Sequence, residues 1–201
     1  MKKEEVDEAL DSLRVITNET HMLVVGTQSL HGTHPDAPDS IMLSREVDVV
    51  LKHKARLANW ISDVVGDGTP FEAERGYFID HVAMKEGMPV LAAGWEARVT
   101  RTHSMPGCTV DYLAPEDLAI AKLGAGRAKD LQFVQGMLDH GFVSMERIRE
   151  LASSVAPAFR GKVETSLNAV EINRKFEAAS RMARLQDQQE PAPAAKPDRE
   201  L

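Results

Sequence analysis

Hydrophobic positions along the chain first follow a helical period and then gather in short runs. Near the N-terminus apolar side chains recur every three or four positions, with acidic residues on the other face: Val6, Leu10, Leu13 and Ile16. Five short segments rich in β-branched or other apolar residues predict strands: 22–25, 46–51, 76–82, 96–102 and 109–113. Residues 55–65 again have helical spacing and end at a Gly-Asp-Gly turn. This order of elements predicts an α+β fold.

The character of the sequence changes after residue 113. Ala114-Pro115-Glu116-Asp117 is a typical helix start, with proline early and acidic residues in the first turn. The helical pattern then continues and is broken near 124–126, 141 and 157. The last residues are rich in proline, alanine and charge, and we expect them to be disordered. The sequence therefore predicts three parts: an α/β core at 1–113, a helical part at 114–188 and a tail at 189–201.

The composition narrows the class of protein. Of the 201 residues, 43% are hydrophobic and 27% are charged, which excludes a collagen-like chain and wholesale disorder. No apolar run is long enough to span a bilayer, and the N-terminus lacks the apolar region of a secretory signal. The single cysteine, Cys108, excludes an internal disulfide and a zinc site built from several thiolates. We expect a cytoplasmic protein with no membrane contact.

The net charge argues against one class of partner. Lys and Arg number 24 and Asp and Glu number 31, so the formal charge is −7. Proteins that hold duplex DNA without sequence preference usually have the opposite balance, so we expect no general duplex DNA binding. A nucleotide or an RNA end held through a metal ion stays compatible with an acidic protein, because metal sites are themselves acidic.

Two polar motifs are associated with the first two predicted strands. Gly26-Thr27-Gln28-Ser29 follows the strand at 22–25, where a glycine turn and hydroxyl groups can hold a phosphate. Glu46 and Asp48 are two residues apart on the next strand, so their side chains point to the same side. Adjacent carboxylates repel each other unless a cation lies between them, and oxygen-only ligands suit Mg²⁺. The sequence therefore predicts a Mg²⁺ site beside a phosphate-binding turn.

A third carboxylate would complete a site for phosphoryl or nucleotidyl transfer. Asp80, in the predicted strand at 76–82, is the favoured candidate, and Asp111 in the last predicted strand is the rival. A site without a third carboxylate is the remaining alternative, and it would favour binding of a nucleotide without turnover.

The combined motifs resemble the nucleotidyltransferase superfamily of the DNA polymerase beta type, and more closely the bacterial AbiEii-type toxin nucleotidyltransferases of toxin–antitoxin and phage-defence systems. The resemblance rests on segments between about residues 20 and 135: Val25-Gly26-Thr27-Gln28-Ser29-Leu30-His31-Gly32, His34-Pro35-Asp36-Ala37-Pro38, Arg45-Glu46-Val47-Asp48, Gly94-Trp95-Glu96-Ala97-Arg98, and Leu113-Ala114-Pro115-Glu116-Asp117-Leu118-Ala119 running on to Lys122, Arg127, Lys129 and Asp130. It implies a minimal nucleotidyltransferase fold, a small mixed sheet with flanking helices, followed by a helical part.

The resemblance also implies a role for each motif. It places the nucleoside triphosphate at the glycine turn and at three basic residues: Gly26, Thr27, Gln28, Ser29, Lys122, Arg127 and Lys129. It makes Glu46, Asp48 and Asp80 the catalytic and Mg²⁺-binding carboxylates. The implied activity is nucleotidyl transfer to a hydroxyl of an RNA, a protein or a small molecule, with a cognate antitoxin or another operon product as partner. Two departures stand out: Gly-Thr replaces the usual Gly-Ser, and the first acid is Glu rather than Asp.

Structural interpretations of the same residues remain open. The glycine turn can be a capped strand-to-helix connection, the acid pair can be the solvent side of an edge strand, and the basic residues can form surface ion pairs. His31 and His34 fit loop positions near a pocket better than a zinc site, and His81 fits a polar contact better than a catalytic base. The alternative functions are a non-catalytic binding or regulatory partner of the same fold and a structural adaptor that acts through its C-terminal helices.

Overall fold

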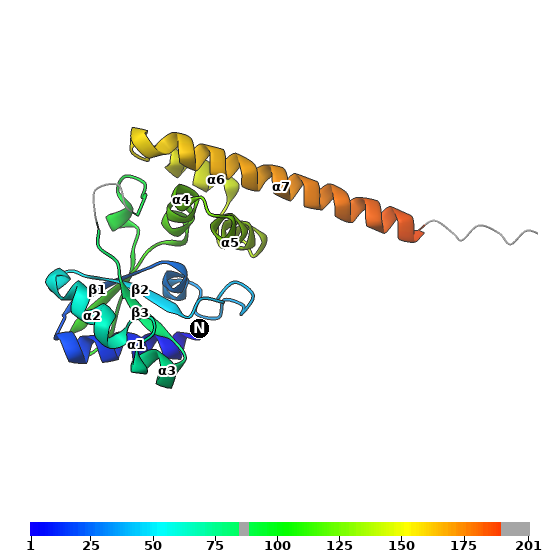
Figure 1. The fold of residues 1–201 in the computed structure, drawn as a ribbon. Coiled ribbons are helices and arrows are strands. Elements are labelled where there is room, and N and C mark those ends of the chain that lie inside the picture. Colours follow the sequence, from blue (N-terminus) through cyan, green and yellow to red (C-terminus); the bar gives the residue numbers. More distant parts are fainter. Residues whose placement is uncertain (85–88, 190–201) are drawn as a thin grey trace, which may run out of the picture.

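A mixed β-sheet forms the centre of the N-terminal half. The computed structural model describes residues 1–84 and 89–189, and among them five strands pair in the order β3-β2-β1-β5-β4 (Figure 1). The strands are β1 (His21–Val25), β2 (Glu46–Leu51), β3 (Phe78–His81), β4 (Thr100–Met105) and β5 (Cys108–Tyr112). The β1–β2 and β4–β5 pairs are antiparallel, whereas β1–β5 and β2–β3 are parallel. This mixed sheet with flanking helices confirms the predicted α+β class.

The helices α1 (Lys3–Thr17) and α2 (Ala58–Val65) cover one face of the sheet, on which alternate side chains of the strands are apolar. Side chains at even positions of β1 and odd positions of β2 pack in one hydrophobic cluster with α1 and α2. In α1 the buried residues follow the predicted stripe, except that Ile16 is 38% exposed. The helix ends at Asn18, whose φ of 52° caps it in the left-handed conformation.

The opposite face of the sheet carries the helical part. Four helices follow β5: α4 (Pro115–Ala125), α5 (Ala128–Asp139), α6 (Met145–Ala152) and α7 (Pro157–Gln189). Leu23 and Val25 of β1 share a buried cluster with Leu118 and Leu123 of α4. The helical part therefore packs on the same core as the sheet, and the division at residue 113 stays a prediction. Figure 1 shows the C-terminal half of α7 running beyond the rest of the molecule.

The helix ends follow the sequence signals. Gly126, with φ of 68°, caps α4, Gly141 follows α5, and Pro157 begins α7. The predicted tail lies outside the described residues except for Gln189, the last residue of α7. Within the described ranges, no helix is both long and apolar enough to cross a membrane.

Some local elements differ from the sequence prediction. The short helix that follows the glycine turn is of the 3₁₀ type, η1 (Thr27–Gly32), and the predicted helix at 55–65 begins with another, η2 (Ala55–Leu57). The fourth strand begins later than expected, because Trp95–Ala97 forms the 3₁₀ turn η3. The helix α3 (Pro70–Arg75) was not predicted, although its start carries a signal. Thr69 accepts a hydrogen bond from the Glu72 amide, while the Glu72 side chain accepts one from the Gly68 amide.

Candidate active site

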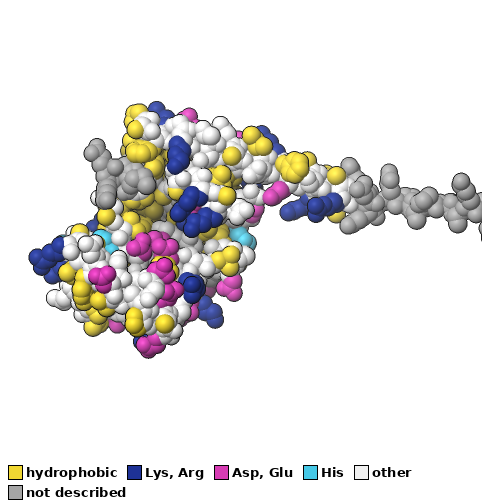
Figure 2. All heavy atoms as spheres, viewed as in Figure 1, with side chains coloured by type: hydrophobic (Ala, Val, Ile, Leu, Met, Phe, Trp, Pro, Cys, Tyr) yellow, Lys and Arg dark blue, Asp and Glu magenta, His cyan; other side chains and the backbone are white. Residues whose placement is uncertain are grey.

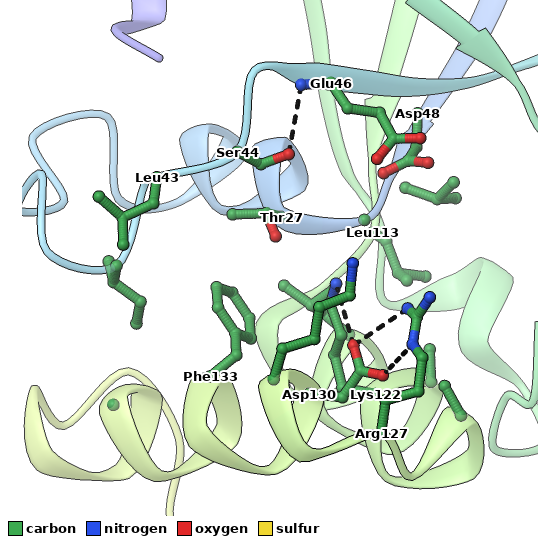
Figure 3. Close-up of a pocket in the computed structure, with 18 of the residues that line it drawn as sticks. Thr27, Leu43, Ser44, Glu46, Asp48, Leu113, Lys122, Arg127, Asp130 and Phe133 are labelled. Atoms are coloured by element: carbon green, nitrogen blue, oxygen red, sulfur yellow. Dashed lines mark hydrogen bonds and ion pairs between the residues drawn. The ribbon is translucent and has the colours of Figure 1, made fainter.

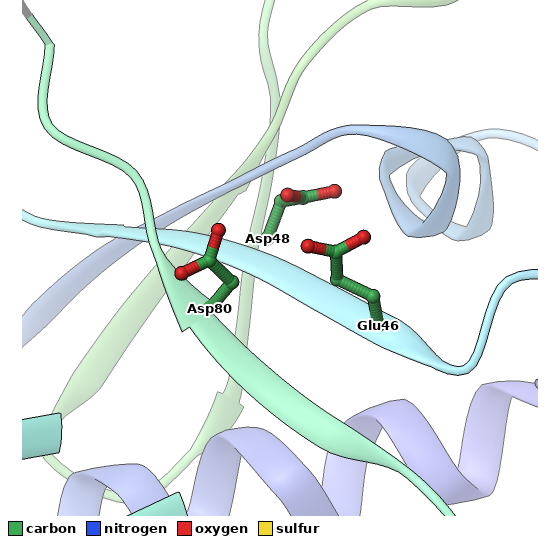
Figure 4. Close-up of side chains that lie close together, drawn as sticks. All are labelled: Glu46, Asp48 and Asp80. Atoms are coloured by element: carbon green, nitrogen blue, oxygen red, sulfur yellow. The ribbon is translucent and has the colours of Figure 1, made fainter. Parts of the chain in front are cut away.

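Three carboxylates meet where β2 lies beside β3. Glu46 and Asp48 point to the same side of β2, as their spacing predicts. Asp80 is the direct partner of Asp48 in the parallel β2–β3 pair, so its side chain lies on the same face. One oxygen from each carboxylate lies within 4.8 Å of the other two (Figure 4). We call these three residues the acidic triad.

The sheet order decides between the two candidates for the third carboxylate. Asp111 belongs to β5, on the far side of β1 from β2, and its carboxylate receives hydrogen bonds from Arg101 at 2.7 and 3.0 Å. It also contacts His21 Nε2 at 2.8 Å. The structure therefore brings Asp80, and not Asp111, to the predicted pair.

Repulsion and burial make the triad a poor place for three negative charges. Burial and then the neighbouring Asp80 raise the pKa of Glu46. Burial and then Glu46 raise the pKa of Asp48 to about 7. A divalent cation would remove both penalties, and oxygen-only ligands at this spacing fit Mg²⁺. The donor set therefore agrees with the predicted metal site, while the identity of the ion is not fixed by it.

Gly26 is the backbone against which Asp48 lies. Its φ is 64°, and a Cβ atom at this position would lie 1.8 Å from Oδ2 of Asp48. Both observations exclude a side chain here unless Asp48 moves. The glycine thus allows the Asp48 carboxylate to lie directly against the backbone of the turn, whether or not the turn also contacts a ligand.

The other residues of the turn divide into two groups. Thr27 lines a cavity next to the acidic triad. Gln28 is fully buried and donates a hydrogen bond to the Ser44 carbonyl, and the Ser29 hydroxyl donates to the Gly26 carbonyl at 2.8 Å. Neither lines the cavity, so the structure gives Gln28 and Ser29 contacts within the protein, and their predicted role at a nucleotide stays a prediction.

The cavity between the sheet and the helical part has a volume of about 830 Å³. The acidic triad, Gly26 and Thr27 form one wall, and Lys122 of α4 with Arg127 and Lys129 at the start of α5 belongs to the opposite wall. Figure 3 shows Lys122 and Arg127 extending from the helices toward the strand that carries Glu46 and Asp48. On the surface, acidic and basic side chains gather close together between the two halves (Figure 2).

Asp130 holds two of these cations in place. Its carboxylate is 1% exposed, receives Arg127 Nε at 2.6 Å and lies 3.6 Å from Lys122 Nζ. Burial opposes its ionisation, but the Arg127 hydrogen bonds and the charge of Lys122 outweigh it and keep the pKa of Asp130 below its usual value. The ionised Asp130 carboxylate therefore holds Lys122 and Arg127 at the wall of the cavity.

We expect Asp130→Asn to lower stability at neutral pH by about 1–3 kcal/mol, because the charged hydrogen bonds are lost. Arg127 is 61% exposed, so solvent screening keeps the effect at the lower end of this range. Since the folded-state pKa of Asp130 is depressed, its contribution is present above the unfolded pKa and disappears as pH falls through the folded value. Thermal unfolding at neutral and acid pH measures this. A difference between wild type and variant that grows toward acid pH would contradict it.

The cavity also has an apolar wall that the sequence analysis missed. Ile41, Leu43 and Phe133 line it, and Lys122 Nζ lies 5.2 Å from the centre of the Phe133 ring. His140, directly after α5, also lines the cavity. The α5 residues that line the cavity recur at helical spacing from Lys129 onward, which is the signal that could have identified Phe133. No comparable pattern marks Ile41 or Leu43, because they lie in an irregular segment before β2.

The histidines near these motifs have other surroundings. His31 is buried, and its Nε2 lies 3.2 Å from the Met1 carbonyl oxygen. His34 stacks on Phe142 with 4.3 Å between ring centroids. Strand alternation turns His81 to the face opposite to its neighbour Asp80. None of the three is among the described residues that line the cavity.

Comparison with known proteins assigns a family to this arrangement. The family model described as "Nucleotidyltransferase of unknown function (DUF6036)" matches residues 2–184, which include the sheet, the acidic triad and the cationic wall. Neither a curated protein nor a solved structure gave a significant match. The match covers most of the chain, and the protein therefore belongs to this nucleotidyltransferase family.

Proposed function

We propose that the protein catalyses metal-dependent transfer of a nucleotidyl group from a nucleoside triphosphate to an acceptor hydroxyl. The observation that carries this proposal is the acidic triad facing Lys122, Arg127 and Lys129 across one cavity. A nucleoside triphosphate needs both walls: carboxylates for the accompanying metal ion, and cations for the phosphate oxygens that the metal leaves uncovered.

Each group has a defined part in the reaction. Glu46, Asp48 and Asp80 would hold Mg²⁺, which supplies charge neutralisation at the phosphates and lowers the pKa of a hydroxyl. Asp80 would accept the proton of the acceptor hydroxyl as its oxygen bonds to the α-phosphorus. The bond from that phosphorus to the bridging oxygen breaks in line, and pyrophosphate leaves toward Lys122 and Lys129. Thr27, beside the triad, offers a hydroxyl to a phosphate oxygen.

The finer assignments rest on the sequence resemblance alone. They comprise the relation to the DNA polymerase beta type and to AbiEii-type toxins, a toxin–antitoxin or defence setting and a cognate antitoxin. The cytoplasmic location is a separate expectation from the composition of the chain. The acceptor stays open among an RNA end, a protein and a small molecule. A non-catalytic partner of the same fold was the alternative for a site with no third carboxylate, and the position of Asp80 in the triad removes that reason for it.

Calorimetry of nucleotide binding tests the proposal. We expect nucleoside triphosphates to bind only in the presence of Mg²⁺. The Glu46→Ala/Asp48→Ala variant should bind them at least tenfold more weakly. Asp36→Ala/Asp39→Ala is the matched control, because it removes the same formal charge at two exposed residues that do not themselves line the cavity. Binding that is independent of Mg²⁺, or unchanged when both triad carboxylates are removed, would contradict a metal-dependent enzyme.

A further inference from the structure

Two histidines at the other end of β1 each contact a buried carboxylate through one ring nitrogen. His21 begins β1, and its Nε2 lies 2.8 Å from Oδ2 of Asp111. His53 follows β2, and its Nδ1 lies 2.8 Å from Oε1 of Glu19. The side chains of Asp111 and Glu19 are 5% and 0% exposed, whereas those of His21 and His53 are 28% and 59% exposed. Each ring is therefore anchored on its inner side and reaches solvent on its outer side.

The two carboxylates are themselves held firmly. Glu19 accepts hydrogen bonds from the backbone amides of Thr20, His21, His53 and Lys54. Asp111 receives two from the Arg101 guanidinium. Both histidines thus face a carboxylate that several other donors hold in place.

A carboxylate acceptor fixes the tautomer of a neutral imidazole. The N–H group faces the carboxylate, and the lone pair is left on the other nitrogen, Nδ1 of His21 and Nε2 of His53. Among the described residues, neither of these nitrogens has a hydrogen-bond partner. A histidine that binds a metal usually has this arrangement, with a carboxylate orienting the ring from the second nitrogen. The ring centroids of His21 and His53 are 6.3 Å apart.

We propose that His21 and His53 together bind one divalent transition-metal ion of the Zn²⁺ type, with water completing the coordination. With bonds of about 2.0–2.1 Å from one ion to a nitrogen of each ring, the two ring centroids would be about as far apart as observed if the rings lay on nearly opposite sides of the ion. A tetrahedral ion would bring the rings closer, so the exposed His53 ring would have to turn about its hydrogen bond to Glu19 when the ion binds. The ion would join the α1–β1 connection to the segment after β2.

This site is separate from the acidic triad in place and in chemistry. His21 begins β1, whereas Gly26, beside Asp48, follows its last residue. Imidazole nitrogens favour Zn²⁺ and related ions, while the carboxylates of the triad suit Mg²⁺. The inference therefore does not depend on the proposed nucleotidyl transfer.

Titration of the full-length protein with Zn²⁺ in excess Mg²⁺ tests the proposal, because Mg²⁺ occupies the oxygen ligands of the triad. We expect His21→Ala and His53→Ala each to weaken the tightest Zn²⁺ binding at least tenfold by calorimetry, with an unchanged circular dichroism spectrum. His103→Ala is the matched control: His103 is exposed on β4, and its ring contacts the Thr109 hydroxyl rather than a carboxylate. This variant should bind Zn²⁺ like wild type. Unchanged affinity in His21→Ala or His53→Ala, or an equal loss in His103→Ala, would overturn the proposal.

Discussion

Replacing Asp48 with asparagine should stabilise the metal-free protein at pH 8 and abolish its Mg²⁺-dependent nucleotide binding. Burial and the neighbouring Glu46 raise the pKa of Asp48 from 3.8 to about 7, so an ionised Asp48 is unfavourable in the folded state. At 1.36 kcal/mol per pKa unit, this corresponds to an upper limit of about 4 kcal/mol. We expect a gain of about 1–3 kcal/mol, because the asparagine amide must still be accommodated beside Gly26.

The pH dependence of this effect has a definite sign. Asp48 ionises near its ordinary pKa in the unfolded chain but stays protonated up to about pH 7 in the folded protein. The wild-type protein therefore loses stability relative to Asp48→Asn as pH rises from about 4 to about 7, and the difference is constant above that. Urea unfolding in the presence of a chelator at pH 4, 6 and 8 measures the difference.

Asp111→Asn is the control with the opposite expectation. Burial opposes ionisation of Asp111, but Arg101 and His21 outweigh it and keep its pKa below the usual value. Its ionised form therefore stabilises the folded state, and the asparagine variant should be less stable at neutral pH. If Asp48→Asn also proved destabilising at pH 8, the acidic triad would not be a site of unfavourable charge.

Gly26→Ala should destabilise the protein by about 2–4 kcal/mol and remove Mg²⁺-dependent nucleotide binding. The backbone at Gly26 has φ 64° and ψ −165°, a conformation that costs other residues about 1–3 kcal/mol. The added Cβ atom would also lie 1.8 Å from Oδ2 and 2.7 Å from Cγ of Asp48. Asp48 must therefore move out of the triad. We expect Mg²⁺-dependent binding to be lost even under conditions in which the variant is still folded. Thermal unfolding and calorimetry measure the two effects separately.

A second glycine separates backbone strain from the loss of the triad. Gly107 has φ 70°, and a Cβ atom there would meet nothing within 4 Å. Gly107→Ala should therefore carry a backbone cost alone, with Mg²⁺-dependent binding retained. Wild-type binding by Gly26→Ala, or equal binding loss in both variants, would show that contact with Asp48 is not what Gly26 provides.

Local patterns were sufficient for most of the fold. Helical spacing in 3–17, the apolar character of 46–51 and the breaks at Gly126, Gly141 and Pro157 identify elements that the structure contains. Such patterns depend on which side chains are apolar and on which backbone conformations glycine and proline allow. The six-residue helix α3 is too short to show a clear apolar period, and its signals in the sequence are the cap Thr69 and Pro70 in its first turn.

The sequence by itself determined that Glu46 and Asp48 share one side of a strand, because alternation along a strand is a property of the backbone. Only the tertiary structure decided which carboxylate joins them. Asp80 and Asp111 both lie in strands, and the choice depends on β3, rather than β5, being the neighbour of β2. Strand order is set by packing between distant segments, as is the position of Lys122 and Arg127 opposite the triad. These long-range contacts leave no periodic pattern in the chain, so the sequence left them open.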